Sequence, residues 1–285
     1  MKPYKIPTGY YFWNDFAIQT YTFCSNFSTT KNNQIKRITD GLSLKEMRFT
    51  PIYCLKKQLI EEIKLTDVRE KTGVLVDLKV AIPSLVLFLP ENTIKSPMNE
   101  GAFIKYIVVH HYEINNEVYK TGILWLSIDS SDEFLIGTRN VRYDGITKSN
   151  EVQGNEYVKK NFFDIQNLIL QSLMILQTYP ELSEEVLPSE VFKEGSKHNT
   201  SSHRLPRWLG GERVRRNYSN ETSPTGITVA PHIRSGHWRS QPYGKQNQLR
   251  KMIWLRPVWV NYALKLQIEQ TEQTEQTEQL VLTRG

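Results

Sequence analysis

The chain has 285 residues, enough to bury a sizeable core in one large domain or in one domain with an appendage. Hydrophobic residues make up 39% of it and aromatic residues 11%, a composition that excludes a wholly disordered chain. The formal net charge of +6 is unevenly spread, because residues 196–262 hold twelve Lys and Arg against two Glu. Positive charge confined to one quarter of the chain predicts an anionic partner for that quarter.

Several classes of protein are excluded by what the sequence does not contain. The two cysteines, Cys24 and Cys54, make no disulfide framework and lack metal-ligand spacing. The longest apolar run, Ala81 to Pro90, is about half as long as a membrane-spanning helix. The N-terminus does not read as a secretory signal, and phosphate-loop, zinc-protease and dinucleotide motifs are missing. We therefore expect a soluble cytoplasmic protein that needs no membrane, metal or cofactor.

Residues 1–195 are expected to form an α+β domain, an antiparallel sheet packed on a long apolar helix. An amphipathic pattern predicts a short helix over Cys54–Lys64. From Thr72 to Tyr143, short apolar runs separated by turn residues predict the strands of an antiparallel meander. Residues Asn161–Tyr179 are apolar nearly all round, which predicts a helix buried against the sheet and ended by Pro180.

Residues 196–228 are polar, basic and rich in Gly, Ser and Pro, and we interpret them as a flexible linker. Arginines are interspersed there with two aromatic residues, which suits contact with phosphates and unpaired bases, although a solvated charged tether explains the same composition. The candidate nucleic-acid-binding residues of the linker are Arg204, Arg207, Trp208, Arg213, Arg215 and Arg216. Residues 263–285 hold a three-residue Thr-Glu-Gln repeat and are interpreted as a low-complexity tail.

Residues 229–262 are expected to form a basic, aromatic β-hairpin appendage, with strands at His237–Tyr243 and Leu249–Leu255 joined by a five-residue loop. Strict alternation predicts that Leu249, Ile253 and Leu255 face the main domain, which would leave an outward face of Arg and Trp. The candidate nucleic-acid-binding residues of the hairpin are Arg234, Trp238, Arg239, Arg250, Trp254 and Arg256.

The hairpin also holds the candidate catalytic residues His232, Arg234, His237 and Arg239. A convergent His–Arg–His cluster could hold a phosphate, with His as general acid or base, as a metal-independent ribonuclease needs. The two histidines converge only if the chain bends at Ser235–Gly236. The alternative is a structural hairpin whose arginines pair with carboxylates of the first domain.

One segment resembles a known group of proteins. The stretch P-H-I-R-S-G-H-W-R from Pro231, followed by I-W-L-R-P-V-W-V-N at residues 253–261, is similar to a C-terminal signature of proteins from bacterial plasmids, prophages and other mobile elements. The resemblance implies a bacterial cytoplasmic protein from a mobile element, and it carries over no catalytic residue.

Three hypotheses about function follow. The first is an accessory protein of a mobile element that binds nucleic acid or another polyanion through its basic C-terminal region. The second is a toxin-like, metal-independent endoribonuclease that uses the histidines and arginines of the hairpin. The third is a protein-interaction module whose basic segment docks on an acidic partner or on its own first domain. Whether the chain is an enzyme stays open at this point.

Overall fold

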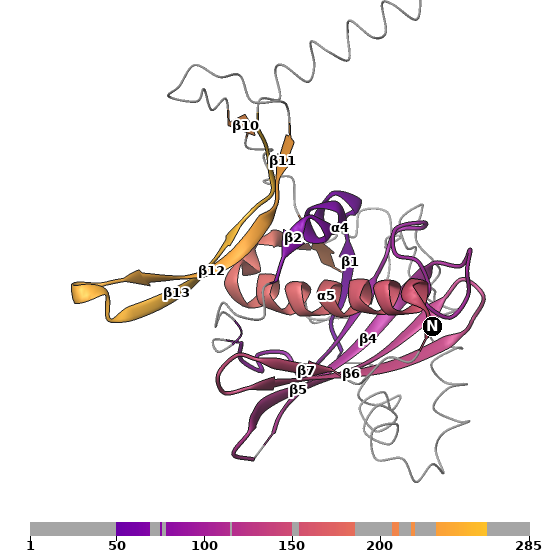
Figure 1. Ribbon diagram of the computed structural model, residues 1–285, viewed down its shortest axis with the longest axis horizontal. Helices are drawn as coiled ribbons and strands as arrows, with labels where there is room; N and C mark the ends of the chain where they lie inside the picture. Colours follow the sequence, from indigo (N-terminus) through magenta and orange to yellow (C-terminus); the bar gives the residue numbers. More distant parts are fainter. Residues whose placement is uncertain are drawn as a thin grey trace, which may run out of the picture.

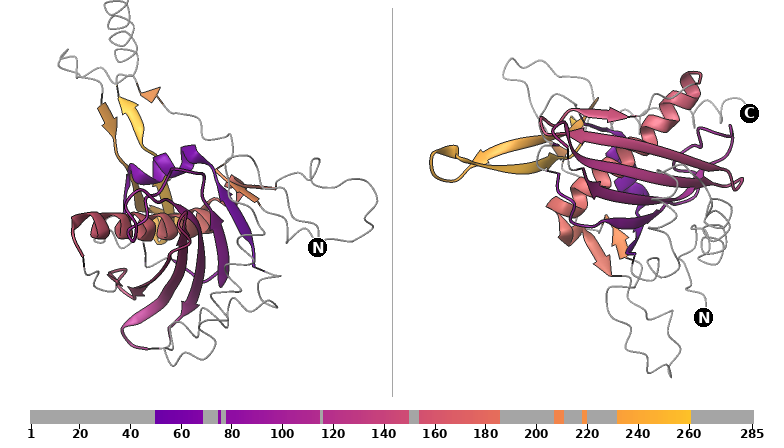
Figure 2. Two further views of the ribbon diagram at one scale, coloured as in Figure 1. Left: turned by 90° about the vertical axis from the view of Figure 1, so that its right-hand side faces the viewer. Right: turned by 90° about the horizontal axis from the view of Figure 1, so that it is seen from below.

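The computed structural model describes residues 50–68, 75, 78–114, 116–149, 154–185, 207–210, 218–219 and 232–260. These residues form a mixed α/β fold in which a large sheet curves round one long helix (Figure 1, Figure 2). Helices are few in this part of the chain: α4 (Lys57–Lys64), α5 (Glu156–Thr178) and the short 3-10 turns η3 (Pro180–Leu182) and η6 (Lys245–Asn247). The expected combination of helices and sheet is confirmed at this level.

The main sheet has eight strands in the order β7-β6-β5-β4-β3-β1-β9-β8. They are β1 (Ile52–Leu55), β3 (Ser84–Phe88), β4 (Ile104–Glu113), β5 (Tyr119–Asp129), β6 (Phe134–Arg142), β7 (Thr147–Ser149), β8 (Ser183–Glu185) and β9 (Arg207–Leu209). From β3 to β7 each strand pairs antiparallel with the next along the chain, as the predicted meander requires. Strand β1 lies parallel to both β3 and β9, so the sheet is mixed and the purely antiparallel prediction is wrong at this end.

The last two residues of β1, Cys54 and Leu55, are ones for which the sequence predicted the beginning of a helix. All four residues of β1 are buried, as is typical of a strand with neighbours at both edges and packing on both faces. Helix α4 begins only at Lys57 and turns Leu59, Ile60 and Ile63 toward the core. A short apolar run directly before an amphipathic helix gives nearly the same periodic signal as a longer helix, which explains the error.

Helix α5 lies across one face of the main sheet (Figure 2). The Asn155 side chain accepts a hydrogen bond from the Val158 backbone N–H at 3.0 Å and caps the first turn, so the helix begins at Glu156 rather than at Asn161. Phe162 packs on Trp125 of β5, with ring centroids 5.5 Å apart. No helix in the described residues is long and apolar enough to cross a membrane.

The remaining strands form two small sheets, with the orders β13-β12-β2 and β10-β14-β11. They are β2 (Thr66–Asp67), β10 (Tyr218–Ser219), β11 (His232–Arg234), β12 (Gly236–Tyr243), β13 (Leu249–Leu255) and β14 (Val258–Val260). Strand β2, which follows α4 directly, pairs parallel with the beginning of β12. The predicted C-terminal hairpin therefore joins the main domain at its base.

The predicted linker is also partly built into the fold. Within residues 196–228, strand β9 belongs to the main sheet, and its last residue, Leu209, is fully buried. The backbone N–H of Gly210 then donates a hydrogen bond to the Leu182 carbonyl at 3.0 Å. Apolar side chains decide this outcome, because burying Leu209 between β1 and β8 outweighs the loop-forming composition around it.

Candidate nucleic-acid interface

The C-terminal strands form one long two-stranded ribbon. Strand β11 pairs antiparallel with β14, and β12 continues the same register with β13, from His232 opposite Val260 to Tyr243 opposite Leu249. No residue is inserted at Ser235 or Gly236, so the strand has no β-bulge at this point. The ladder is interrupted there because Pro257 on the opposite strand has no N–H to donate. At about 3.4 Å per residue the ribbon is about 40 Å long.

Gly236 lets the ribbon approach the main domain closely. Its backbone N–H donates a hydrogen bond to the Leu65 carbonyl at 3.0 Å. A Cβ at this position would lie 2.6 Å from Thr66 Oγ1 and 2.8 Å from the Pro257 backbone nitrogen, so only glycine fits without a shift of the backbone.

The middle of the ribbon is fixed by four side chains that we call the tryptophan clasp: Trp238, Met252, Trp254 and Tyr179. The indoles of Trp238 and Trp254 stack at 5.7 Å and 10°, and only 1% and 5% of their surfaces are exposed. Tyr179, directly after α5, lies 6.3 Å from the Trp238 ring. Burial of two indoles gives the clasp a large hydrophobic stabilisation.

Polar contacts fix the geometry of the clasp. The Trp254 backbone N–H donates to Tyr179 Oη at 3.1 Å, and its indole N–H donates to Thr66 Oγ1 at 3.2 Å. The buried Gln171 amide of α5 donates to the carbonyls of Ile63 and Thr66 at 3.1 and 3.3 Å. Helix α5, strand β2 and the ribbon are thus held in one arrangement.

The clasp reverses the predicted orientation of the hairpin. Trp238, Met252 and Trp254 face the core, whereas Leu249, expected to be buried, is 54% exposed. The prediction of an outward Arg and Trp face is therefore wrong for both tryptophans. The physical reason is size, because an indole buries far more apolar surface than an Ile or Leu side chain at the same site.

Arg256 also helps to hold the ribbon on the body, next to the tryptophan clasp. Its guanidinium lies 5.0 Å from the centre of the Trp254 ring and 4.0 Å from the Glu62 carboxylate of α4. The predicted nucleic-acid-binding residues Trp238, Trp254 and Arg256 thus have structural roles here. This half of the ribbon docks on the body of the same chain.

Beyond the clasp the ribbon projects from the body, and we call residues 239–251 the arm (Figure 1). Arg239, Lys245, Arg250 and Lys251 are all exposed on it, and the arm contains no Asp or Glu. The Arg239 guanidinium donates to Gln241 Oε1 at 2.6 Å. Among the described residues, no carboxylate forms a salt bridge with these four cations.

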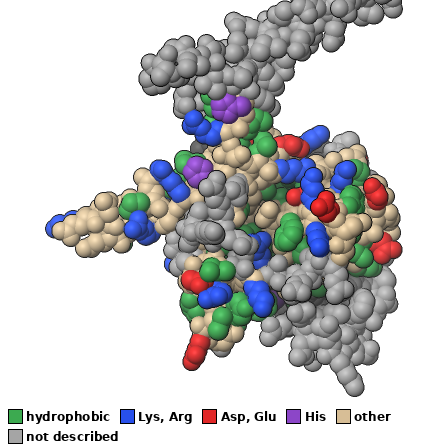
Figure 3. Space-filling model, viewed as in Figure 1, with side chains coloured by type: hydrophobic (Ala, Val, Ile, Leu, Met, Phe, Trp, Pro, Cys, Tyr) green, Lys and Arg blue, Asp and Glu red, His purple; other side chains and the backbone are tan. Residues whose placement is uncertain are grey.

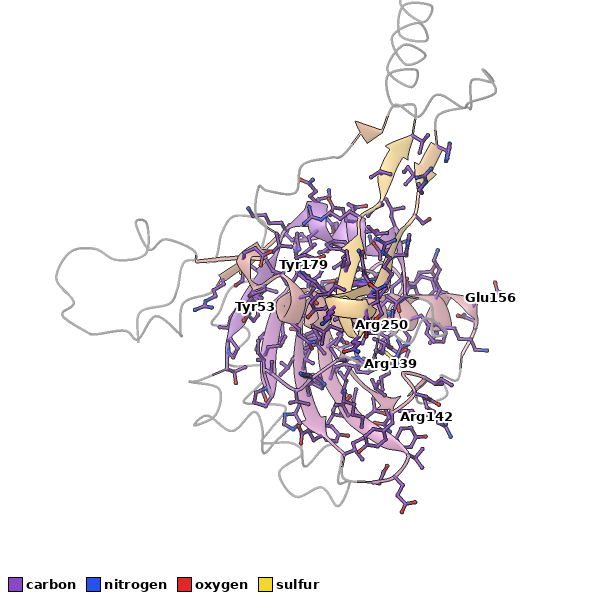
Figure 4. The ribbon with its side chains drawn as sticks, turned by 90° about the vertical axis from the view of Figure 1, so that its left-hand side faces the viewer. Tyr53, Arg139, Arg142, Glu156, Tyr179 and Arg250 are labelled. Carbon is purple, nitrogen blue, oxygen red and sulfur yellow. The ribbon has the colours of Figure 1, made fainter. Side chains whose placement is uncertain are left out.

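The figures show how the arm presents its charge. In Figure 3 the arm carries basic and hydrophobic side chains, while acidic side chains gather on the body. Figure 4 looks at the arm from its tip, with Arg250 on the arm and Tyr179 near the end of α5. The arm also exposes Tyr243, 46% of whose surface is accessible, opposite Leu249. Sequence reasoning missed these two residues as an exposed pair, because alternation placed Leu249 inside.

The histidines do not form a cluster. His232 and His237 are both exposed, but they lie five residues apart in a ribbon of continuous register, about 17 Å along the strand. Arg234 and Arg239 are separated in the same way. Figure 3 shows exposed histidine side chains at two separate places on the face that it draws. This geometry gives no support to the ribonuclease hypothesis.

The other predicted site residues lie elsewhere. Arg207 is a half-buried residue of β9, and its charge opposes the rise that burial causes in the pKa of the Tyr53 hydroxyl. Trp208 is the next residue of β9, and its backbone pairs with Cys54. Four candidates fall outside the described residues: Arg204, Arg213, Arg215 and Arg216. The described ranges contain no group of three or more His, Cys, Asp or Glu that could hold a metal ion.

The histidine pair in the meander is part of the sheet. His110 Nδ1 lies 3.0 Å from Ser84 Oγ on the neighbouring strand, and its ring stacks on Tyr112. His111 faces the opposite side and is buried, and this burial, with smaller contributions from His110 and Lys120, lowers its pKa to about 4. His111 is therefore neutral at physiological pH.

The chain matches the model of a known protein family. The model of the AcrVA2-like family, described as the anti-CRISPR type V subtype A2 family, matches residues 53–262, which run from β1 to just beyond β14. No curated protein matches the chain. A solved structure described as the crystal structure of AcrVA2 matches with 17% identity and a TM-score of 0.43, over 90% of this chain and 88% of that chain. Because the family model covers most of the sequence, the chain belongs to the AcrVA2-like anti-CRISPR family, a family associated with mobile elements.

Proposed function

We propose that this protein protects a mobile element by inhibiting type V CRISPR immunity, and that its arm contacts nucleic acid in doing so. Family membership supports the first part. The observation that carries the second part is a projecting arm with four exposed cations and no acidic residue, fixed to the body by a buried clasp. Under this proposal the protein acts in the bacterial cytoplasm, where CRISPR effectors meet their targets.

Two physical arguments favour nucleic acid as the ligand of the arm. Lys and Arg bind phosphates and release the counterions condensed on the backbone, so closely spaced cations on one element suit a polyanion. The clasp holds the base of the arm before any ligand arrives, which reduces the conformational entropy lost on binding. The cations concerned are Arg239, Lys245, Arg250 and Lys251. Replacing all four with Gln gives what we call the arm-neutral variant.

A transformation assay tests the proposal. Cells with an active type V system receive a plasmid that carries its target, with or without this protein. Wild-type protein should restore transformation, and the arm-neutral variant should lose most of that protection. The matched control removes four exposed lysines from the body by Lys57→Gln, Lys95→Gln, Lys148→Gln and Lys159→Gln, and should protect as wild type does.

The outcomes separate the two parts of the proposal. Absence of protection by well-expressed wild-type protein would show that inhibition of this immunity is the wrong function. Full protection by the arm-neutral variant would show that inhibition does not use the charge of the arm.

An acidic protein partner is the second candidate, favoured by the exposed Tyr243 and Leu249 beside the arm cations. Aromatic and aliphatic side chains within a charged rim are typical of protein interfaces. Capture of a cellular protein by wild type but not by Tyr243→Ala, unchanged by nuclease treatment, is the result that this candidate predicts. Loss of all capture after nuclease treatment would instead indicate nucleic acid.

A further inference from the structure

We infer that the ligand of the arm is double-helical B-form DNA and that the arm enters its major groove. This inference rests on the proposed contact with nucleic acid and specifies its class. Four features of the arm carry it: its supply of aromatic side chains, its width, its free length and the chemistry of its tip.

The arm lacks a stacking platform for unpaired bases. Proteins that bind single strands place several aromatic side chains along a basic groove, and each base stacks on one of them. Trp238 and Trp254 could have done so, but both are buried in the clasp. Tyr243 is the single aromatic residue of the arm between Arg239 and Lys251. A lone tyrosine beside four cations favours a ligand recognised by its phosphates and groove rather than by exposed base faces.

The dimensions of the arm suit a major groove. An antiparallel two-stranded ribbon is narrow enough to enter the major groove of B-form DNA, which is about 12 Å wide and about 8.5 Å deep. The last anchored pair is Ser240 with Met252, and three further pairs precede the turn. These pairs extend about 10 Å, and the turn adds to that reach. The tip can therefore touch base edges while the clasp stays outside the groove.

The chemistry of the tip suits base edges and phosphates together. Exposed amides lie at Gln246, Asn247 and Gln248, in a turn where Gln246 and Asn247 have φ of 57° and 56°. Side-chain amides can donate to and accept from an adenine edge in the major groove, while Lys and Arg reach the flanking phosphates. Lys245 directly precedes these amides in the chain, and Arg250 and Lys251 follow them by two and three residues. The same major groove in A-form RNA is too narrow and deep for side chains to read, which favours DNA.

Fluorescence anisotropy with three labelled probes tests the inference: a 20-base-pair DNA duplex, one of its strands alone, and the RNA duplex of the same sequence. The duplex DNA should bind at least about fivefold more tightly than either other probe at equal salt. Tyr243→Ala should leave this order unchanged, because stacking is not the source of affinity. Protection of guanine N7 from methylation should mark the major groove.

Each outcome decides between the claims. Equal or tighter binding of the single strand or the RNA duplex, or binding of duplex DNA without N7 protection, overturns this inference and leaves contact with nucleic acid intact. Absence of binding to all three probes at low salt overturns the proposed contact itself, and this inference with it. The arm-neutral variant serves as the negative control, and its thermal unfolding should match wild type because all four substituted side chains are exposed.

Discussion

Trp254 joins the ribbon to β2 and to Tyr179, the residue that follows α5. Its indole stacks on Trp238, donates to Thr66 and lies under Arg256, and its backbone N–H reaches Tyr179. Trp254→Ala should lower the free energy of unfolding by about 3–5 kcal/mol, because it removes a buried aromatic side chain and leaves a cavity. Chemical denaturation measures this. The exposed Leu249→Ala should change the same quantity by about 0.5 kcal/mol or less, and an equal loss in both variants would contradict the clasp.

Substitution of Gly236 tests whether the ribbon lies as close to the body as the structure shows. Gly236→Ala places a methyl group within 2.8 Å of the Pro257 backbone nitrogen and should destabilise the fold by about 1–3 kcal/mol. Its neighbour Ser235 is exposed, so Ser235→Ala is the matched control and should have little effect on the melting temperature. If both variants melt with wild type, the ribbon does not dock at Gly236.

The lowered pKa of the buried His111 predicts that the stability of the protein depends on pH. Its pKa is about 4 in the folded protein against an ordinary value of 6.5, so the unfolded chain takes up a proton on this ring at a higher pH than the folded chain. The free energy of unfolding should therefore fall as pH drops from about 6.5 to about 4, by at most about 3 kcal/mol from this group, and should level off below. Urea titrations of wild type and His111→Gln at several pH values isolate the contribution. A constant difference between the two proteins across that range would contradict it.

At the scale of elements, the arm and the clasp separate binding from stability. Residues 242–250 can be replaced by Asn-Gly, which forms a two-residue hairpin turn between the facing residues Gln241 and Lys251. The shortened protein should melt within a few degrees of wild type, since the replaced residues are exposed. It should lose most of its affinity for nucleic acid. Cooperative unfolding at a much lower temperature would mean that the outer arm supports the fold.

Sequence patterns predicted some elements and failed at others for identifiable reasons. Alternation and turn residues located the strands from β3 to β6, and the hairpin pairing of Tyr243 with Leu249 follows from its short loop. Alternation also separated the two hairpin faces correctly but could not say which face is inside. That choice depends on Thr66, Tyr179 and Gln171, which are distant in sequence and meet the ribbon only in the fold.

At the scale of the whole molecule, only some of the basic residues that are concentrated in the C-terminal region lie on an exposed surface of the described residues. Arg207 and Arg256 lie within the body, while Arg239, Lys245, Arg250 and Lys251 extend from it on the arm. The resemblance to mobile-element proteins agrees with the family that residues 53–262 match. Composition alone could not assign these roles, because a half-buried cation–π contact and an exposed phosphate contact use the same residue types.

The salt dependence of DNA binding tests the central claim, that the charge of the arm contacts the phosphate backbone. Affinity for the DNA duplex is measured at a series of salt concentrations for wild type, the arm-neutral variant and the body-lysine control. Each lost phosphate contact changes the slope of log affinity against log salt by about 0.9, so the arm-neutral slope should be shallower by about 3–4. The body-lysine control should keep the wild-type slope. Equal slopes for wild type and the arm-neutral variant would contradict the account.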